Sequence, residues 1–132
     1  TLPTFRPRVQ FPSPAPIVIM TDLHEKKCIP CRGGIPPFDI SEIHKYLKKI
    51  DGWDVKKNKE NSFFLEKNFK FEDFLKSQNF VNKVGDIAEK EGHHPDISFG
   101  WGYAEVKIFT HKINGLVESD FILAAKIDKI LY

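Results

Sequence analysis

The sequence has only two cysteines and one methionine, and it lacks both a long apolar run and a strong net charge. Two cysteines are too few for a disulfide framework, so we expect a reducing compartment such as the cytoplasm. No run approaches the roughly 20 apolar residues that a transmembrane helix needs. Twenty basic and eighteen acidic residues leave a charge of +2 without a basic stripe, which argues against direct binding of nucleic acid.

Proline is almost absent after residue 37, since eight of the nine prolines lie in residues 1–37. Proline fixes φ and removes a backbone donor, so this stretch is predicted to be an extended arm. Residues 1–19 read either as a leader before a native start at Met20 or as the remnant of a targeting segment, because Arg6 and Arg8 are basic and no acid precedes Asp22. Residues 38–132 are expected to form a single domain.

Regular periodicity begins at Asp39 and predicts three helices and two hairpins. Asp39 and Glu42 form a capping box for the first helix, which Gly52 ends. Gly92 is expected to end the second helix, and Ser119 and Asp120 to open the third. Alternating apolar residues predict the strands between them. The strands are predicted at 53–57, 62–69, 97–101 and 104–109, and the second helix from about residue 71.

This order favours an α+β fold, in which three helices pack on one face of a four-stranded antiparallel sheet in the order helix, strand, strand, helix, strand, strand, helix. Trp53 is expected to pack in the core, and Trp101 in the core or at a subunit interface. The residues expected to face inward from the second helix are Phe74, Val81, Val84, Ile87 and Ala88. The third helix is expected to carry a broad apolar surface, which consists of Phe121, Ile122, Ala124, Ala125, Ile127, Ile130 and Leu131.

Three of the five histidines lie between positions 93 and 111. Imidazole is the side chain whose ordinary pKa lets it give and take protons near neutral pH, so the cluster predicts paired acid and base chemistry. Glu89 stands four positions before His93-His94-Pro95, while Thr110-His111 and Asp120 follow.

These residues and their spacing resemble the signature of the pterin-4a-carbinolamine dehydratases. The resemblance runs from about Lys26 to the C-terminus, and Trp101 fills the aromatic position of the signature. The sequence departs from the pattern at Val117, where the family commonly carries a hydroxyl residue, and at Phe109, where a small polar residue is common. These departures bear on the entry to the third helix and on the pocket wall.

The resemblance implies a hydro-lyase that dehydrates 4a-hydroxytetrahydrobiopterin to quinonoid dihydropterin and water, in support of tetrahydrobiopterin recycling. It implies a pterin as the small-molecule substrate, no redox cofactor and no metal, and a homodimer or homotetramer. It assigns proton transfer to His93 and His111, and substrate orientation to His94.

Five further residues complete the predicted site. Glu89 is expected to reach the His93 imidazole and fix its tautomer, with a solvated charge at the helix end as the alternative. Thr110 is a candidate for binding the polar pterin edge, or for strand packing alone, and Phe109 for the pocket wall. Asp120 is assigned structural support with an indirect effect on His111, and Pro95 supports the bend at His94.

Two competing interpretations remain open. Three histidines with Glu89 are possible zinc ligands, and Cys28 and Cys31 with His24 are a possible metal or redox site, or else two packing thiols. The second interpretation, after a metal or redox site, is that the protein is an interaction module. Animal relatives of the family act as dimerisation cofactors of a homeodomain transcription factor, that is, as transcriptional coactivators. The wide apolar face with Phe121, Ile122 and Ala125 would serve such a protein partner, or self-association.

Overall fold

A computed structural model describes residues 22–29 and 36–131 of the chain. The predicted leader and Cys31 lie outside the described residues. The elements are a 3-10 helix η2 (Leu23–Glu25), α2 (Ile40–Leu47), β1 (Asp54–Lys57), β2 (Phe63–Lys70), α3 (Phe74–Glu91), β3 (Asp96–Gly100), β4 (Tyr103–Ile108) and α4 (Glu118–Asp128). The predicted α+β class and the order of helices and strands are confirmed. None of these helices is long and apolar enough to cross a bilayer.

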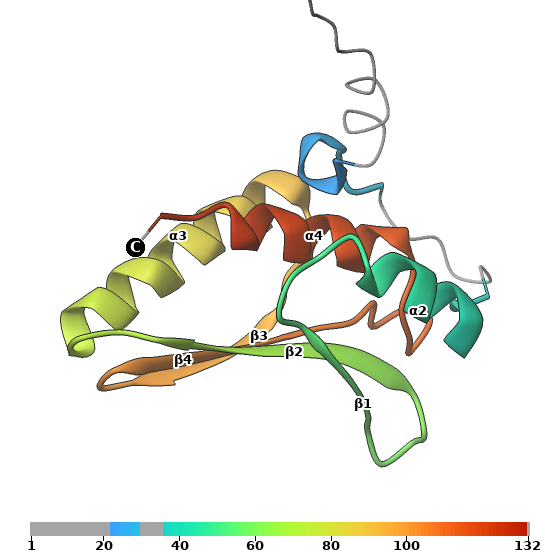
Figure 1. Cartoon of the computed structure of the whole chain (residues 1–132), viewed down its shortest axis with the longest axis horizontal. Coiled ribbons are helices and arrows are strands. Elements are labelled where there is room, and N and C mark those ends of the chain that lie inside the picture. Colours follow the sequence, from blue (N-terminus) through green and yellow to red (C-terminus); the bar gives the residue numbers. More distant parts are fainter. Residues whose placement is uncertain (1–21, 30–35, 132) are drawn as a thin grey trace, which may run out of the picture.

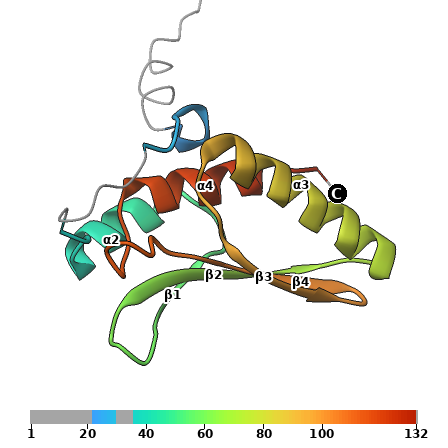
Figure 2. The ribbon, with the colours of Figure 1, turned by 180° about the vertical axis from the view of Figure 1, so that it is seen from behind.

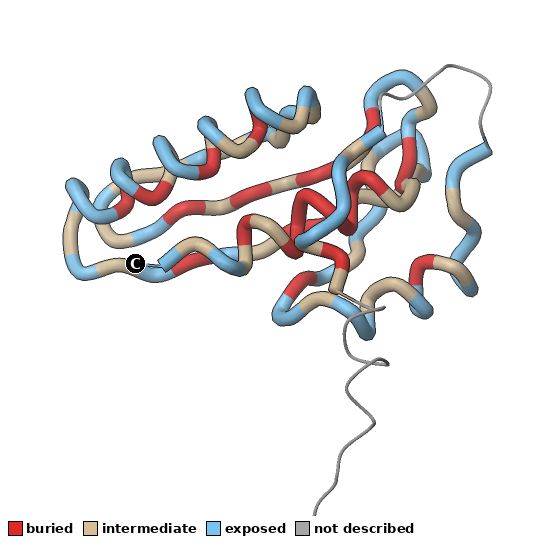
Figure 3. The backbone as a smooth tube through the Cα atoms, turned by 90° about the horizontal axis from the view of Figure 1, so that it is seen from above, coloured by how far each residue is buried: buried red, intermediate tan, exposed pale blue. Residues whose placement is uncertain are grey.

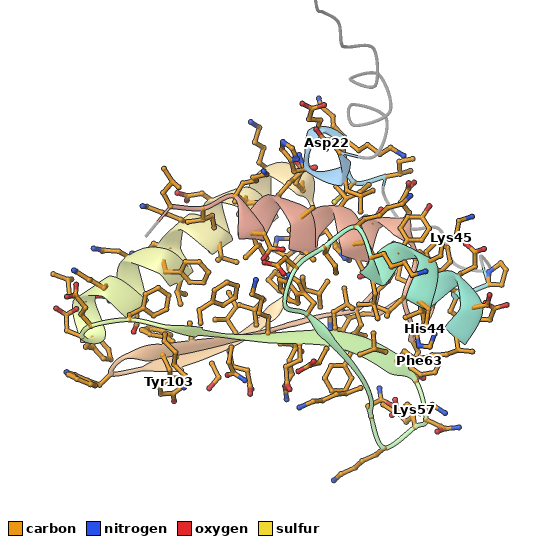
Figure 4. All side chains as sticks on the ribbon, in the orientation of Figure 1. Asp22, His44, Lys45, Lys57, Phe63 and Tyr103 are labelled. Carbon is orange, nitrogen blue, oxygen red and sulfur yellow. The ribbon has the colours of Figure 1, made fainter. Side chains whose placement is uncertain are left out.

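The four strands form one antiparallel sheet in the order β1-β2-β4-β3. Its register places Leu65 opposite Ile108, and Phe69 opposite Ala104. The helices lie on one side of this sheet (Figure 1), and the view from behind shows the same layering (Figure 2). Tyr103 points to the other side, away from the helices (Figure 4). Among the described residues no helix covers that second face.

The core lies between the sheet and the helices. Successive strand residues point to opposite faces, so every second residue of β4 is buried, and buried and exposed positions alternate along the chain (Figure 3). The aromatic ring of Phe80 from α3 packs on Phe69 of β2, with ring centroids 4.5 Å apart. Side chains that are fully buried in this layer include Ile43, Leu65, Val84, Val106, Ile108, Leu116 and Leu123.

Helix α4 is buried on almost every side, which corrects one sequence prediction. Phe121, Ile122 and Ala125 were expected to offer a surface to a partner, yet they are only 0%, 2% and 8% exposed. The sheet covers one side of α4, and the segment around η2 lies on the side away from the sheet (Figures 1 and 2). Leu23 of η2 is 3% exposed and joins the core. The apolar face is therefore filled within the chain.

Phe74 was expected to face inward and is exposed instead, and two other large apolar side chains, Leu131 and Trp101, are exposed as well. Phe74 is the first residue of α3 and packs with a tilted ring against Phe99 at the edge of the sheet, where it stays 46% exposed. Leu131 lies beyond the end of α4 and is 86% exposed. Trp101 occupies the turn between β3 and β4 and is 71% exposed. Trp53 is buried as predicted, and its indole N–H donates to Asp128 at 3.0 Å.

The burial of α4 makes a prediction about stability. Leu123→Ala should lower the free energy of unfolding by about 2–5 kcal/mol, because it opens a cavity in a fully buried layer. Leu75→Ala makes the same chemical change on α3 at a side chain that is 61% exposed, and should cost less than about 1 kcal/mol. Urea denaturation of both variants measures the difference. Equal losses would contradict the layering described above.

Candidate active site

The carboxylate of Asp120, in the first turn of α4, is fully buried. Its Oδ1 lies 2.7 Å from Nε2 of His93. Its Oδ2 accepts hydrogen bonds from the Thr110 hydroxyl and from the Val117 backbone N–H, both at 2.8 Å. A buried carboxylate is costly unless such partners satisfy it. One side chain therefore joins the segments that follow α3, follow β4 and precede α4.

Gly92 sets the direction of the chain at His93. It ends α3 in the left-handed region at φ 65°, where a residue with a Cβ is strained. The backbone N–H of His93 then donates back to the Ala88 carbonyl at 3.1 Å. The His93 side chain is 15% exposed, whereas that of His94 is 59% exposed. The two adjacent imidazoles thus differ in both burial and partner.

Glu89 contacts His94 rather than His93, which corrects the contact predicted from sequence. The prediction assumed that the helix continues for one turn past Glu89, but α3 ends at Glu91 and Gly92 turns the chain. Glu89 and His94 form an ion pair in which both side chains are exposed. Solvent screens such a pair, so it contributes little to stability. Glu89 and His94 therefore stand apart from the buried carboxylate.

The contact with Asp120 defines the chemistry open to His93. An ionised carboxylate has only acceptor atoms, so Nε2 of His93 carries the hydrogen and donates it. In the neutral ring Nδ1 is then the acceptor, and it has no hydrogen-bond partner among the described residues. Nδ1 is therefore the ring nitrogen of His93 that stays open to a further hydrogen-bond partner.

His111 lies in a tight turn that Thr110 and Gly115 close. The Thr110 N–H donates to the Gly115 carbonyl at 2.8 Å, and the Asn114 N–H donates to the His111 carbonyl at 3.2 Å. The His111 ring is exposed and packs on Phe109, with centroids 4.2 Å apart. The Thr110 hydroxyl donates to the Asp120 carboxylate that also contacts His93, and His111 is the next residue after Thr110.

Val117, where the family pattern commonly has a hydroxyl residue, is the N-cap of α4. A valine side chain cannot accept a hydrogen bond from the helix. The carboxylate of Asp120 instead accepts the Val117 N–H, so one free donor at the helix entry is satisfied from within the helix. Asp120 thus both supports the helix start and contacts His93. The sequence analysis had predicted the structural support, together with an indirect effect on His111.

Glu91 and Ser119 contact the N-terminal segment, whereas the sequence analysis gave no role to Glu91 and assigned Ser119 only to the start of the third helix. Glu91 accepts the Cys28 backbone N–H at 3.0 Å, and this bond, opposed by burial and aided by Lys126, holds the pKa of the carboxyl below its usual range. The Ser119 hydroxyl accepts the Ile29 N–H at 3.1 Å. The signal for them in the sequence is their proximity to the motif, since Glu91 stands two positions before His93 and Ser119 directly precedes Asp120.

The structure does not bring the proposed zinc ligands together. Nε2 of His93 is bonded to Asp120, and His94 is paired with Glu89. Within residues 22–29 and 36–131, the one group whose ligand atoms lie within 4.8 Å of one another is Asp22, His24 and Glu25. It lies in the arm, outside the motif. A surface hollow of about 510 Å³ nearby is lined by η2 and the ends of α2 and α4, and none of the motif residues lines it.

Cys28 is partly buried, and its thiol donates to the Ser119 carbonyl at 3.5 Å. Burial first, and then the charge of Glu91, raise the pKa of this thiol to about 12. The thiolate is the form that binds metals and attacks disulfides. Cys28 therefore suits packing better than metal or redox chemistry.

Comparison with known proteins identifies relatives of the whole domain. Residues 36–130 match the family model described as pterin 4 alpha carbinolamine dehydratase. A protein of Rubrobacter xylanophilus that carries the same family name is 47% identical over 111 residues, covering 84% of this chain and all of its own length. A Rickettsia canadensis protein with this name is 51% identical over 110 residues, covering 83% and 97%.

Two solved structures are similar as well. A transcriptional coactivator/pterin dehydratase from Brucella melitensis shares 30% identity with a TM-score of 0.62, over 70% of this chain and 95% of its own. A pterin dehydratase-like protein identified as a RuBisCO assembly factor in the α-carboxysome shares 23% identity with a TM-score of 0.50, over 58% and 86%. The second likeness shows the fold alone.

The raised pKa of Cys28 predicts slow alkylation. At pH 8 an ordinary thiol is about one-tenth thiolate, whereas a thiol with a pKa of about 12 is ionised in about one molecule in ten thousand. In a Cys31→Ser variant, iodoacetamide should therefore label Cys28 about a thousandfold more slowly in the native protein than in urea. Mass spectrometry of timed samples gives both rates. Similar rates in a variant shown to be folded would contradict the burial of this thiol.

Proposed function

Because the chain belongs to the pterin-4a-carbinolamine dehydratase family, we propose that it removes water from 4a-hydroxytetrahydrobiopterin and so supports tetrahydrobiopterin recycling. The observation that carries the proposal is the buried carboxylate of Asp120, which holds Nε2 of His93 and leaves Nδ1 to exchange a proton. Turnover needs neither an oxidant nor a reductant. The histidines of the motif suffice for the acid and base steps.

Dehydration breaks the bond between C4a and the hydroxyl oxygen. One group protonates the departing oxygen, and a second removes a proton from a ring nitrogen, so water leaves and the quinonoid dihydropterin forms. We assign the base to His93, because the Asp120 carboxylate holds Nε2 and leaves Nδ1 as the acceptor. We assign the acid to His111, whose ring is exposed. Each such group contributes roughly a hundred- to ten-thousandfold in rate.

The remaining motif residues bind and orient the pterin in this proposal. His94 and Glu89 form an exposed pair beside the His93 backbone, suited to polar groups at the pterin edge. Phe109 supports the His111 ring. The Thr110 hydroxyl donates to Asp120, so any bond from the substrate to Thr110 uses the oxygen as acceptor. Asp120 and Pro95 act as support.

A second candidate function is protein interaction, through the homodimer or homotetramer itself or through a separate partner. Large apolar side chains stay exposed at the start of α3 and at the β3–β4 hairpin, namely Phe74, Leu75, Trp101 and Tyr103. The similar Brucella melitensis protein is described as a transcriptional coactivator as well as a pterin dehydratase. A pull-down with a double variant of His93 and His111 separates the two roles, because the interaction should survive loss of catalysis.

The acid and base assignment predicts the effect of removing each imidazole. His93→Ala and His111→Ala should each lower kcat by roughly a hundred- to ten-thousandfold, because each removes one proton-transfer group. Stopped-flow absorbance with synthetic 4a-hydroxytetrahydrobiopterin measures the rates. His44→Ala is the matched control, since His44 is exposed on α2 outside the motif, and it should stay within about twofold of the parent.

Two results would contradict the assignment. One is an unchanged kcat in a folded His93→Ala or His111→Ala protein, which would remove that residue from the mechanism. The other is a parent protein that does not accelerate dehydration above the uncatalysed rate, which would remove the proposed reaction itself.

A further inference from the structure

Residues 22–29 bind across α4 and reach the end of α3. The Lys126 ammonium donates to the His24 carbonyl at 2.9 Å, and Lys26 pairs with Glu118 at 2.8 Å. Leu23 enters the core, where it is 3% exposed. The segment lies on the side of α4 away from the sheet (Figures 1 and 2). It is thus held by apolar contacts of Leu23 and Cys28 with the core and by several polar contacts with the domain.

Glu91 is the anchor on α3. Its side chain is 7% exposed, its Oε1 accepts the Cys28 N–H at 3.0 Å, and its Oε2 lies 3.5 Å from the Lys126 ammonium. The lowered pKa of Glu91 agrees with a carboxylate that is held in its charged form, chiefly by the Cys28 N–H. Glu91 is the last residue of α3, two positions before His93. The anchor therefore acts on the helix end from which His93 departs.

Ser119 is the anchor on α4. Its hydroxyl accepts the Ile29 N–H at 3.1 Å and lies 3.3 Å from the Ile29 carbonyl oxygen, to which it donates. The Ser119 carbonyl also accepts the Cys28 thiol. Ser119 is 9% exposed and directly precedes Asp120. This anchor therefore acts on the helix start that carries the buried carboxylate.

The two anchors stand beside the two ends of one hydrogen bond. Nε2 of His93 and Oδ1 of Asp120 are 2.7 Å apart, and the residues are 27 positions apart in sequence. Cys28 touches both flanking residues, Glu91 and Ser119, through its own backbone and thiol. The arm thereby ties the end of α3 to the start of α4 across the point where the imidazole meets the carboxylate.

We propose that Glu91 and Ser119 are positioning residues, through which the arm at residues 22–29 clamps His93 against Asp120. This clamp rests on the dehydratase function proposed above. Its purpose is to fix the position of the His93 ring, which His93 needs in order to act as a base. Neither residue touches the substrate in this scheme. A base displaced by about 1 Å can cost roughly a hundredfold in rate, so a modest loosening should be measurable.

The test compares variants at the two anchors with matched variants elsewhere. Glu91→Ala removes the carboxylate, whereas Glu91→Gln retains one acceptor oxygen for the Cys28 N–H, so it should restore part of the loss. Ser119→Ala removes the other anchor. The controls are Glu72→Ala and Ser41→Ala, which change exposed residues that do not contact the arm. Circular dichroism and thermal unfolding of the full chain confirm that each variant is folded.

Kinetics give the first readout. Glu91→Ala and Ser119→Ala should lower kcat about ten- to a hundredfold with KM within about threefold, because the base is misplaced while the pterin-binding residues are kept. Glu91→Gln should fall between Glu91→Ala and the parent. The controls should match the parent. Unchanged kcat in both anchor variants, or equal loss in the controls, overturns the clamp.

NMR of the His93 ring gives a readout that does not depend on turnover. In the parent, the Nε2 proton bonded to Asp120 should be protected from exchange with solvent, and Asp120→Asn provides the reference for a weakened bond. The anchor variants should speed this exchange by about tenfold or more, as local opening becomes easier. If the parent lacks dehydratase activity, the proposed function is wrong. If neither anchor variant changes the exchange rate, the clamp alone is wrong.

Discussion

The carboxylate of Asp120 is removed from water, so the protein must supply every hydrogen bond that it needs. The donors come from His93, Thr110 and the backbone of Val117, which belong to three separate segments. Moving any one segment would leave a buried acceptor unpaired, at a cost comparable to a large share of a small domain's stability. The fold is thereby constrained at the place where the proposed chemistry occurs.

This constraint orders one histidine and leaves others free. His93 is held at a ring nitrogen by a buried partner, whereas His94 and His111 are exposed, the first beside Glu89 and the second against Phe109. Adjacent positions in the motif thus differ in burial and partner, because Gly92 turns the chain between the helix and the imidazoles. Spacing in the sequence does not reveal that difference, although it places the residues in one region.

Much of the fold follows from periodicity, because strands such as β4 bury every second residue and Gly92 ends α3 as its conformational freedom predicts. The contacts of the site follow less well. The sequence analysis paired Glu89 with His93 by helical spacing, but the helix ends too early for that spacing to apply. The contact from His93 to Asp120 spans 27 positions and depends on the docking of α4, which local patterns do not encode. The same holds for the burial of α4 under the arm.

In the proposed mechanism, the contrast between His93 and His111 has a consequence for turnover. A dehydration that takes a proton from the ring and gives one to the leaving hydroxyl leaves the base charged and the acid neutral. Both must return to their starting states before the next cycle. In the proposed mechanism, the exposed ring of His111 is open to solvent for the return of its proton, whereas His93 is hydrogen-bonded through Nε2 to the buried Asp120 carboxylate and exchanges its proton at Nδ1. The burial of one histidine and the exposure of the other therefore fit the two resetting steps that the proposed cycle requires.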